Sequence, residues 1–63
     1  MEKKRAKIEY WNIHRRLGYV YLTGSIVEHP EFLEGTDVTT SPLIKVDFQR
    51  GIAETKNTIY ELR

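Results

Sequence analysis

The stretch YVYLTGSIVE, residues 19–28, decides the fold class, because its apolar and polar side chains alternate with the two-residue period of a β-strand. One face carries Val20, Leu22 and Ile26, and the other carries Tyr19, Tyr21, Thr23, Ser25 and Val27. Gly24 falls on the apolar face, where a glycine predicts a bulge or a sharp bend. The stretch therefore predicts a half-buried strand that bends.

The residues before this stretch predict a partner strand. Residues 7–14 are rich in aromatic and β-branched types, which favour strands. Residues 15–18 (RRLG) would then reverse the chain, and Gly18 suits the reversal. Residues 1–6 carry charges without a periodic apolar pattern, and we expect a flexible basic arm there.

After the deciding stretch, residues 29–35 (HPEFLEG) have a proline near their start and a glycine at their end. This arrangement predicts one short helical turn. Residues 37–41 would form a short third strand or an extended loop. The next stretch, residues 43–50, places the apolar Ile44, Val46 and Phe48 at alternate positions and predicts a half-buried strand.

The end of the chain carries an irregularity. Gly51 would turn a hairpin, and residues 52–62 read as one last strand. Ile52 and Ile59 have opposite parity within it, so a bulge or burial on both faces must intervene. Together these stretches predict one mostly-β domain over residues 1–63. The expected architecture is a small antiparallel curved sheet, or an SH3-like or OB-like barrel, of four to five strands with one short helical turn.

Composition limits the stability and the location of this domain. A chain of 63 residues buries only about 60% of the surface that it exposes when unfolded. It has no cysteine to add a disulfide, so the core must suffice and a homodimer could supply further burial. No apolar run approaches the roughly 20 residues of a membrane span, and no signal peptide is evident. We expect a cytoplasmic protein that has no contact with a membrane.

Charge is separated along the chain although the net charge is only +1. Six of the ten basic residues precede residue 17, whereas four acidic residues fall within residues 28–37. Such a separation can orient a macromolecular partner, although part of it would cancel if the chain folds back on itself.

Catalytic and metal-binding patterns are weak. His14 and His29 are the only side chains whose ordinary pKa lies near neutral pH, and each stands beside a turn or a proline. A transition-metal site usually needs two or more His or Cys ligands at a defined spacing, and the acidic stretch holds one His. The four glycines are dispersed and form no phosphate-binding loop. We expect no enzyme activity, no metal site and no cofactor.

Two arginines and two tyrosines near the first chain reversal are candidates for a binding surface. Arg15 and Arg16 stand beside Tyr19 and Tyr21, and Arg and Tyr are enriched among the residues that dominate protein interfaces. These four residues predict a contact surface for a protein. The alternative is a nucleic acid, because small barrels stack bases on exposed aromatic rings.

From Trp11 onward, the sequence resembles a group of small uncharacterised proteins found in phages, prophages and bacteria. The shared motifs are Tyr-Leu-x-Gly at residues 21–24, His-Pro-x-Phe at 29–32, Gly35, Thr-Ser at 40–41, and Thr-x-Asn-Thr-x-Tyr-x-Leu at 55–62. The resemblance implies a phage-like origin and carries no established activity. Five polar residues of these motifs could converge on one surface, which would then be the site: His29, Thr40, Ser41, Asn57 and Tyr60.

The sequence thus predicts a non-enzymatic module that binds another macromolecule. The most concrete version is a small phage-encoded inhibitor or adaptor of a host protein. A nucleic-acid-binding small β-barrel is the alternative. A host or phage protein is the expected partner.

Overall fold

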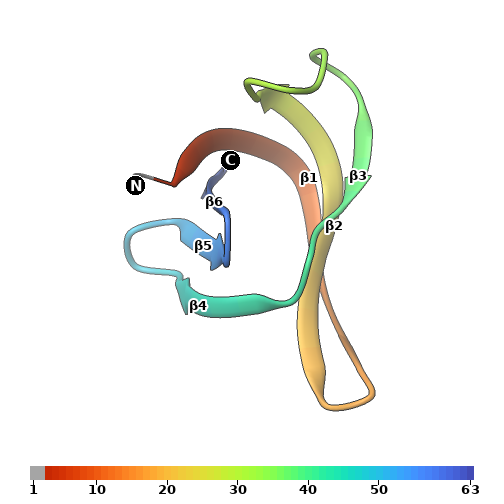
Figure 1. Ribbon diagram of the computed structural model, residues 1–63, viewed down its shortest axis with the longest axis vertical. Coiled ribbons are helices and arrows are strands. Elements are labelled where there is room, and N and C mark those ends of the chain that lie inside the picture. Colours follow the sequence, from red (N-terminus) through yellow and green to blue (C-terminus); the bar gives the residue numbers. More distant parts are fainter. Residues whose placement is uncertain (1–2) are drawn as a thin grey trace.

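The computed structural model describes residues 3–63 and contains six β-strands in one sheet (Figure 1). The strands are β1 (Lys4–Arg16), β2 (Tyr19–Glu28), β3 (Asp37–Thr39), β4 (Leu43–Asp47), β5 (Ile52–Thr55) and β6 (Thr58–Leu62). Their order across the sheet is β3-β2-β1-β6-β5-β4, so the sheet is open and β3 and β4 are its edges. The predicted small β domain is confirmed, with six strands in place of four or five.

The first and last strands lie side by side at the centre of the sheet and run parallel. Their register pairs Lys4 with Thr58 and Ile8 with Leu62, and every other strand pair is antiparallel. The sheet is therefore mixed, whereas the sequence predicted an antiparallel one. The expected flexible arm is wrong for the residues that the structure describes, because 4–6 belong to β1 and Ala6 is buried. Residues 1–2 lie outside the described part of the chain.

The core is small and lies on the inner side of the curled sheet. Its buried apolar members are Ala6, Ile8, Leu22, Ile26, Ala53 and Tyr60. Leu22 and Ile26 of β2 point into it, as the alternation in residues 19–28 predicted. Three threonines are also buried, so hydroxyl groups line part of the interior. Within residues 3–63, the structure contains no helix that is long and apolar enough to cross a membrane.

Gly24 permits a close approach between β1 and β2. A Cβ at this position would stand 2.9 Å from the carbonyl oxygen of Glu9 and 2.9 Å from Cγ1 of Ile8. The bulge near it lies in the partner strand, where an extra residue separates Glu9 from Asn12 in the register and Tyr10 has φ of 53°. Gly24 therefore correctly predicted a bulge, but the extra residue lies in β1 and not in β2.

The expected helical turn after β2 is absent: residues 29–36 form an irregular loop, and no helix occurs in the described chain. The backbone N–H of Gly35 donates to the carbonyl of Ile26 at 2.7 Å, and Ile26 donates to Thr36 at 2.9 Å. These bonds tie the end of the loop back to β2. The N–H of Thr36 also donates to the carbonyl of Leu33 at 3.2 Å, which closes a tight turn at the end of the loop in place of a helical one.

The strand expected in residues 43–50 is confirmed over Leu43–Asp47, but the expected alternation is correct only for Val46. Leu43 pairs with Thr55 and Lys45 pairs with Glu54, so β4 has one extra residue at Ile44. This bulge lets Leu43 and Val46 both pack against the core, although their parity differs. Ile44 and Phe48, which were expected to be half-buried, are 65% and 64% exposed.

The last predicted strand is a hairpin of two strands. The chain reverses at residues 56–57, so β5 and β6 pair antiparallel and Glu54 stands opposite Ile59. Thr55 stabilises the reversal, because its Oγ1 accepts a bond from the N–H of Thr58 at 3.1 Å. The opposite parity of Ile52 and Ile59 is explained by this reversal, and both side chains stay on the outer face.

The curl of the sheet is fixed by the short connection between its edges. β3 and β4 lie at opposite edges but follow one another in the chain, joined by residues 40–42. Thr40 anchors this connection to β2: its N–H donates to the carbonyl of Leu22 at 2.8 Å, and its Oγ1 accepts from the N–H of Leu22 at 2.9 Å. β4 consequently approaches β2 across the interior.

Candidate functional site

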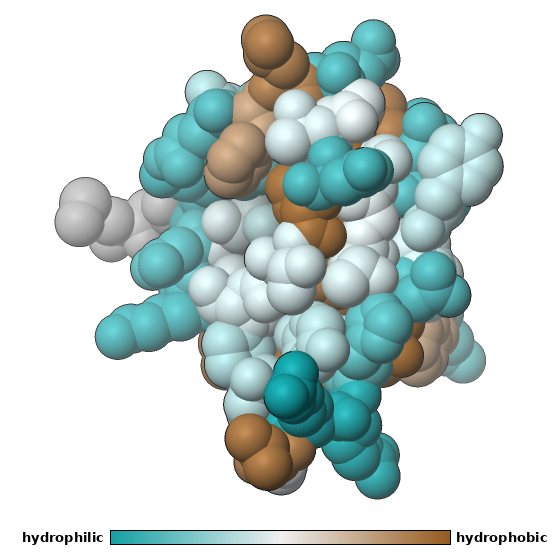
Figure 2. All heavy atoms as spheres, turned by 90° about the vertical axis from the view of Figure 1, so that its right-hand side faces the viewer, coloured by the Kyte–Doolittle hydropathy of each residue, from teal (hydrophilic) through white to brown (hydrophobic). Residues whose placement is uncertain are grey.

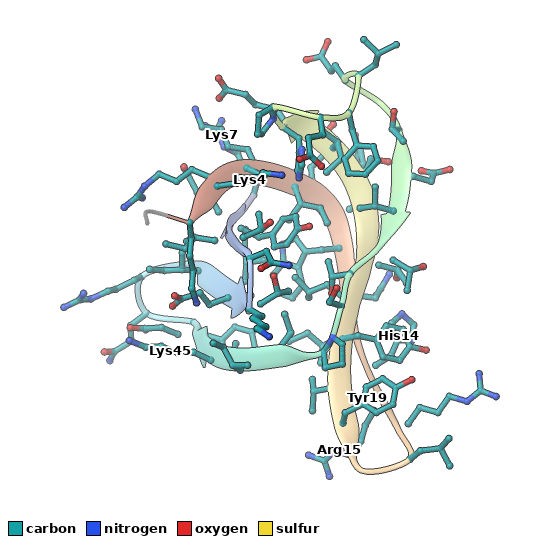
Figure 3. The ribbon with its side chains drawn as sticks, in the orientation of Figure 1. Lys4, Lys7, His14, Arg15, Tyr19 and Lys45 are labelled. Carbon is teal, nitrogen blue, oxygen red and sulfur yellow. The ribbon has the colours of Figure 1, made fainter. Side chains whose placement is uncertain are left out.

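The predicted binding residues fall into two groups at different places. The first group is on the β1–β2 hairpin, where His14 pairs with Tyr21 and Arg16 pairs with Tyr19. Directly paired residues share a face, so these four side chains line one side of the hairpin. The rings of His14 and Tyr21 stack with centroids 5.0 Å apart, and those of Tyr19 and Tyr21 are 5.9 Å apart. Figure 3 shows His14 and Tyr19 together, far from Lys4 and Lys7.

Arg15 is on the other side of the hairpin. It pairs with Val20, and this face continues into Leu22 and the core. The four hairpin residues that the sequence grouped therefore do not form one surface. Arg16, Tyr19 and Tyr21 are together, and Arg15 reaches solvent from the opposite face.

The tip of the hairpin has a strained backbone that the sequence analysis did not identify. Leu17 has φ of 51° and Gly18 has φ of 84°, which is the left-handed pair of a two-residue type I′ turn. Such turns prefer Asn-Gly, and a leucine in the left-handed region is uncommon. Leu17 is also 88% exposed. The sequence carried one signal of this strain, a Leu-Gly pair at a hairpin turn where Asn-Gly is usual.

The hairpin end, residues 13–21, extends beyond the rest of the sheet (Figure 1). β6 accompanies β1 only as far as Ile8, and β3 pairs with β2 only at Thr23–Ser25. The view in Figure 2, onto the side that carries β3, shows side chains of intermediate hydropathy over the middle and hydrophobic ones at the upper and lower ends. The hairpin end is the lower of these ends.

Folding neutralises much of the basic N-terminal segment. The Nζ atom of Lys3 is 2.8 Å from a carboxylate oxygen of Glu54, and that of Lys7 is 3.1 Å from Glu28. Lys4 pairs with Glu31. The Lys3 ammonium group holds the pKa of Glu54 below its usual value. Among residues 3–63, the structure gives no ion pair to the hairpin arginines, so positive charge persists there.

The second group of predicted residues meets at a hollow of about 410 Å³. It opens between β3, the β3–β4 connection, the β5–β6 turn and the loop after β2, where the open sheet leaves its edges apart. The five polar residues that were expected to converge all line it: His29, Thr40, Ser41, Asn57 and Tyr60. Phe32 and Lys4 also line the hollow, and neither was among the predicted site residues.

His29 has one ring nitrogen committed to the backbone. The N–H of Glu31 donates to its Nδ1 at 2.9 Å, so the neutral ring carries its proton on Nε2. Burial, and to a smaller extent the charge of Lys4, lowers the pKa of His29. The ring lies edge-on to Phe32 at 4.7 Å and 6.3 Å from the ring of Tyr60. Burial also raises the pKa of Tyr60, so both groups are neutral at pH 7.

A larger hollow of about 720 Å³ lies on the outer face of β1, β6 and β5. Its floor includes Ile52 and Ile59, and its rim includes Lys7 and Glu28, which pair with each other. None of the described residues forms a cluster of three or more His, Cys, Asp or Glu side chains able to hold a metal ion.

No protein-family model, curated protein or solved structure matches this chain. The hairpin end and the hollow are the two candidate sites of the described residues.

Proposed function

We propose that this protein is a non-enzymatic module that binds another protein through its hairpin end. The observation that carries the proposal is Leu17, a strained apolar residue at the exposed tip of the hairpin. The left-handed region costs most L-residues about 1–2 kcal/mol, and exposure gives the side chain no compensating burial. Residues held in such conformations cluster at functional sites such as ligand clamps and switch regions.

The charges around Leu17 indicate the kind of partner. Arg15 and Arg16 flank the tip from opposite faces, and Tyr19 is 41% exposed beside Arg16. An apolar anchor with a cationic rim fits an apolar pocket with an acidic rim on another protein. Together with the resemblance to small phage and prophage proteins, this supports a cytoplasmic inhibitor or adaptor, encoded by a phage, that acts on a host protein.

The test is a pull-down from bacterial lysate with the wild-type protein and Leu17→Asn. Asparagine tolerates the left-handed region, so the variant should be more stable by about 0.5–1 kcal/mol, part of the strain that Leu17 carries. It should nevertheless lose the partner. The matched control is Leu33→Asn, because Leu33 is 84% exposed but lies in the loop after β2. This control should keep the partner.

Leu17→Asn that retains full binding would overturn the proposal. The nucleic-acid alternative is separated by repeating the capture with nuclease and with added salt. A nucleic-acid complex would dissociate under both treatments, because phosphate contacts release counterions and weaken steeply with salt. A stoichiometric protein that survives both treatments and is lost in Leu17→Asn supports the proposal.

A further inference from the structure

The hollow beside the β3–β4 connection has a floor of hydroxyl groups, which is unusual in a core this small. Thr40, Thr55, Thr58 and Tyr60 line it and are each buried. The hydroxyls of Thr40 and Thr55 are committed to the fold: Thr40 bonds the backbone of Leu22 and Ser41, and Thr55 bonds the backbone of Thr58. They shape the floor and leave recognition to the groups above it.

The groups available for recognition are neutral donors and acceptors. Within residues 3–63, the Ser41 hydroxyl and the Asn57 side-chain amide enter no side-chain hydrogen bond. Tyr60 adds a hydroxyl that bonds to the Thr58 side chain and keeps capacity for a second bond, and the Nε2 proton of His29 adds a donor. Hydroxyl and amide groups both donate and accept, so they match a ligand whose own polar groups do the same.

Two charged groups of the rim form an ion pair with each other, and the third, Asp37, is hydrogen-bonded to a neutral hydroxyl and keeps its negative charge. Lys4 pairs with Glu31, and a carboxylate oxygen of Asp37 accepts a bond from Ser25 at 3.0 Å. An anionic ligand would have to displace Glu31, and a cationic one would have to compete with Lys4. The rim therefore favours a neutral ligand over a phosphate or a carboxylate.

An aromatic wall completes the hollow. His29 holds Phe32 in an edge-on arrangement at 4.7 Å, and the Phe32 side chain remains 46% exposed. The face of an aromatic ring is weakly negative and attracts C–H groups that carry a partial positive charge. A ligand ring with C–H groups on its face and hydroxyls at its edge would contact Phe32 through the C–H groups and bond the polar groups of the hollow through the hydroxyls.

We propose that the hollow binds a neutral polyhydroxylated ligand, one pyranose unit of a sugar, with hydroxyls bonded to Ser41, Asn57 and Tyr60 and one C–H face on Phe32. A volume of about 410 Å³ falls within the range of roughly 300–1,000 Å³ that is usual for small-ligand sites. The site shares no residue with the hairpin end (residues 13–21), so variants can test the two sites separately.

The test is a titration of the ¹⁵N-labelled full chain followed by NMR, with glucose, galactose and N-acetylglucosamine as probes. At least one sugar should give saturable shifts at Ser41, Asn57 and Tyr60, with a dissociation constant on the order of 1 mM, as few contacts imply. Adenosine and inorganic phosphate are run in parallel. The absence of a saturable response to all three sugars, or a response to adenosine or phosphate alone, would overturn the proposal.

Variants separate recognition from folding. Asn57→Ala and Tyr60→Phe should each weaken sugar binding about tenfold, which corresponds to roughly 1.4 kcal/mol and to one hydrogen bond. Tyr60→Phe keeps the buried ring, and Asn57→Ala keeps the backbone carbonyl that accepts from Lys4. The matched controls are Asn12→Ala and Tyr19→Phe, which lie outside the hollow and should leave the affinity unchanged. Equal affinity in all four variants would count against these contacts.

Discussion

Gly24 shows how a single missing side chain holds two strands together. Gly24→Ala would place a Cβ within 2.9 Å of the Glu9 carbonyl and of Ile8, which is completely buried. Backbone cannot yield as a flexible side chain can, so we expect a loss of about 1–3 kcal/mol, as in other overpacked cores. Urea denaturation measures it. The comparison variant is Gly18→Asn, which has open space and a left-handed φ that asparagine tolerates. An equal or larger loss in Gly18→Asn would contradict the overpacking explanation.

His29 gives the protein a pH dependence of stability. Because its folded pKa lies below the ordinary 6.5, the unfolded chain binds more protons between the two values. Stability is therefore fully present above pH 6.5 and is lost as the pH falls toward the folded pKa. Protonation at Nδ1 would also remove the acceptor for the Glu31 N–H.

The variant that checks this is His29→Asn, whose amide oxygen can accept from the same N–H without titrating. The urea midpoint of the wild type should fall between about pH 7.5 and about pH 5.5, and that of the variant should fall less. This range avoids Glu54, whose lowered pKa confines its own loss of stability to pH below 4.5. Parallel decreases in both proteins would assign the effect to another group.

At the scale of elements, the β3–β4 connection depends on one hydroxyl. Thr40→Val keeps the shape of the side chain but removes the acceptor for the N–H of Leu22, which is buried. An unsatisfied buried donor costs about 1–3 kcal/mol. For a domain of this size, the melting temperature should drop by about 4–8 °C for each kcal/mol lost. Thermal unfolding followed by circular dichroism measures the drop. Thr40→Ser restores the hydroxyl and should recover most of it; no difference between the two variants would contradict this role.

The elements that could be predicted are those whose signals are local. The β1–β2 hairpin followed from alternation and from Gly18, and the short β3 matches one of the two alternatives for residues 37–41, a strand or an extended loop. The bulge at Ile44 has no special residue to mark it, so alternation assigned Val46 correctly but placed Ile44 on the core side in place of Leu43. The reversal at residues 56–57 has no glycine or proline and was read as a continuous strand. The parallel pairing of β1 with β6 joins the two ends of the chain, and no local pattern encodes such a pairing.

The candidate site, like the fold, was predictable from the sequence only in part. The five polar residues that were expected to converge do line one hollow, although they come from four separate segments. Phe32 belongs to the same His-Pro-x-Phe stretch as His29, and its place in the hollow was therefore within reach of the sequence. Lys4 was not, because its position depends on the pairing of β1 with β6. Leu17 had one sequence signal, a Leu-Gly pair at a hairpin reversal, whereas its exposure and its left-handed φ are properties of the folded chain.

At the scale of the whole molecule, folding depends on contacts between distant residues. β1 gains its second neighbour in the sheet only when it pairs with β6, which lies at the other end of the chain. Closing such a loop before the contacts stabilise it slows folding. We expect refolding in milliseconds to seconds, the usual range for small all-β domains.

Trp11 offers the measurement, because its indole N–H donates to the carbonyl of Arg63 at 3.0 Å and thus connects β1 to the last residue. Stopped-flow fluorescence after dilution from urea should show the main change of Trp11 in this time range. In the reverse experiment, unfolding in urea, the circular dichroism of the strands should be lost at the same rate as the Trp11 fluorescence changes. A complete fluorescence change within the dead time of mixing would contradict the expectation.

The parallel pairing of β1 and β6 also determines how the protein would respond to mechanical force. The N-terminal end of β1 and the C-terminal end of β6 lie at opposite ends of the paired segment, from Lys4 beside Thr58 to Ile8 beside Leu62. Tension applied between the two termini therefore pulls the strands along each other and loads their hydrogen bonds in shear, all at once. An antiparallel terminal pair would instead be unzipped one bond at a time. Resistance to pulling along this direction is therefore set by the connectivity of the sheet.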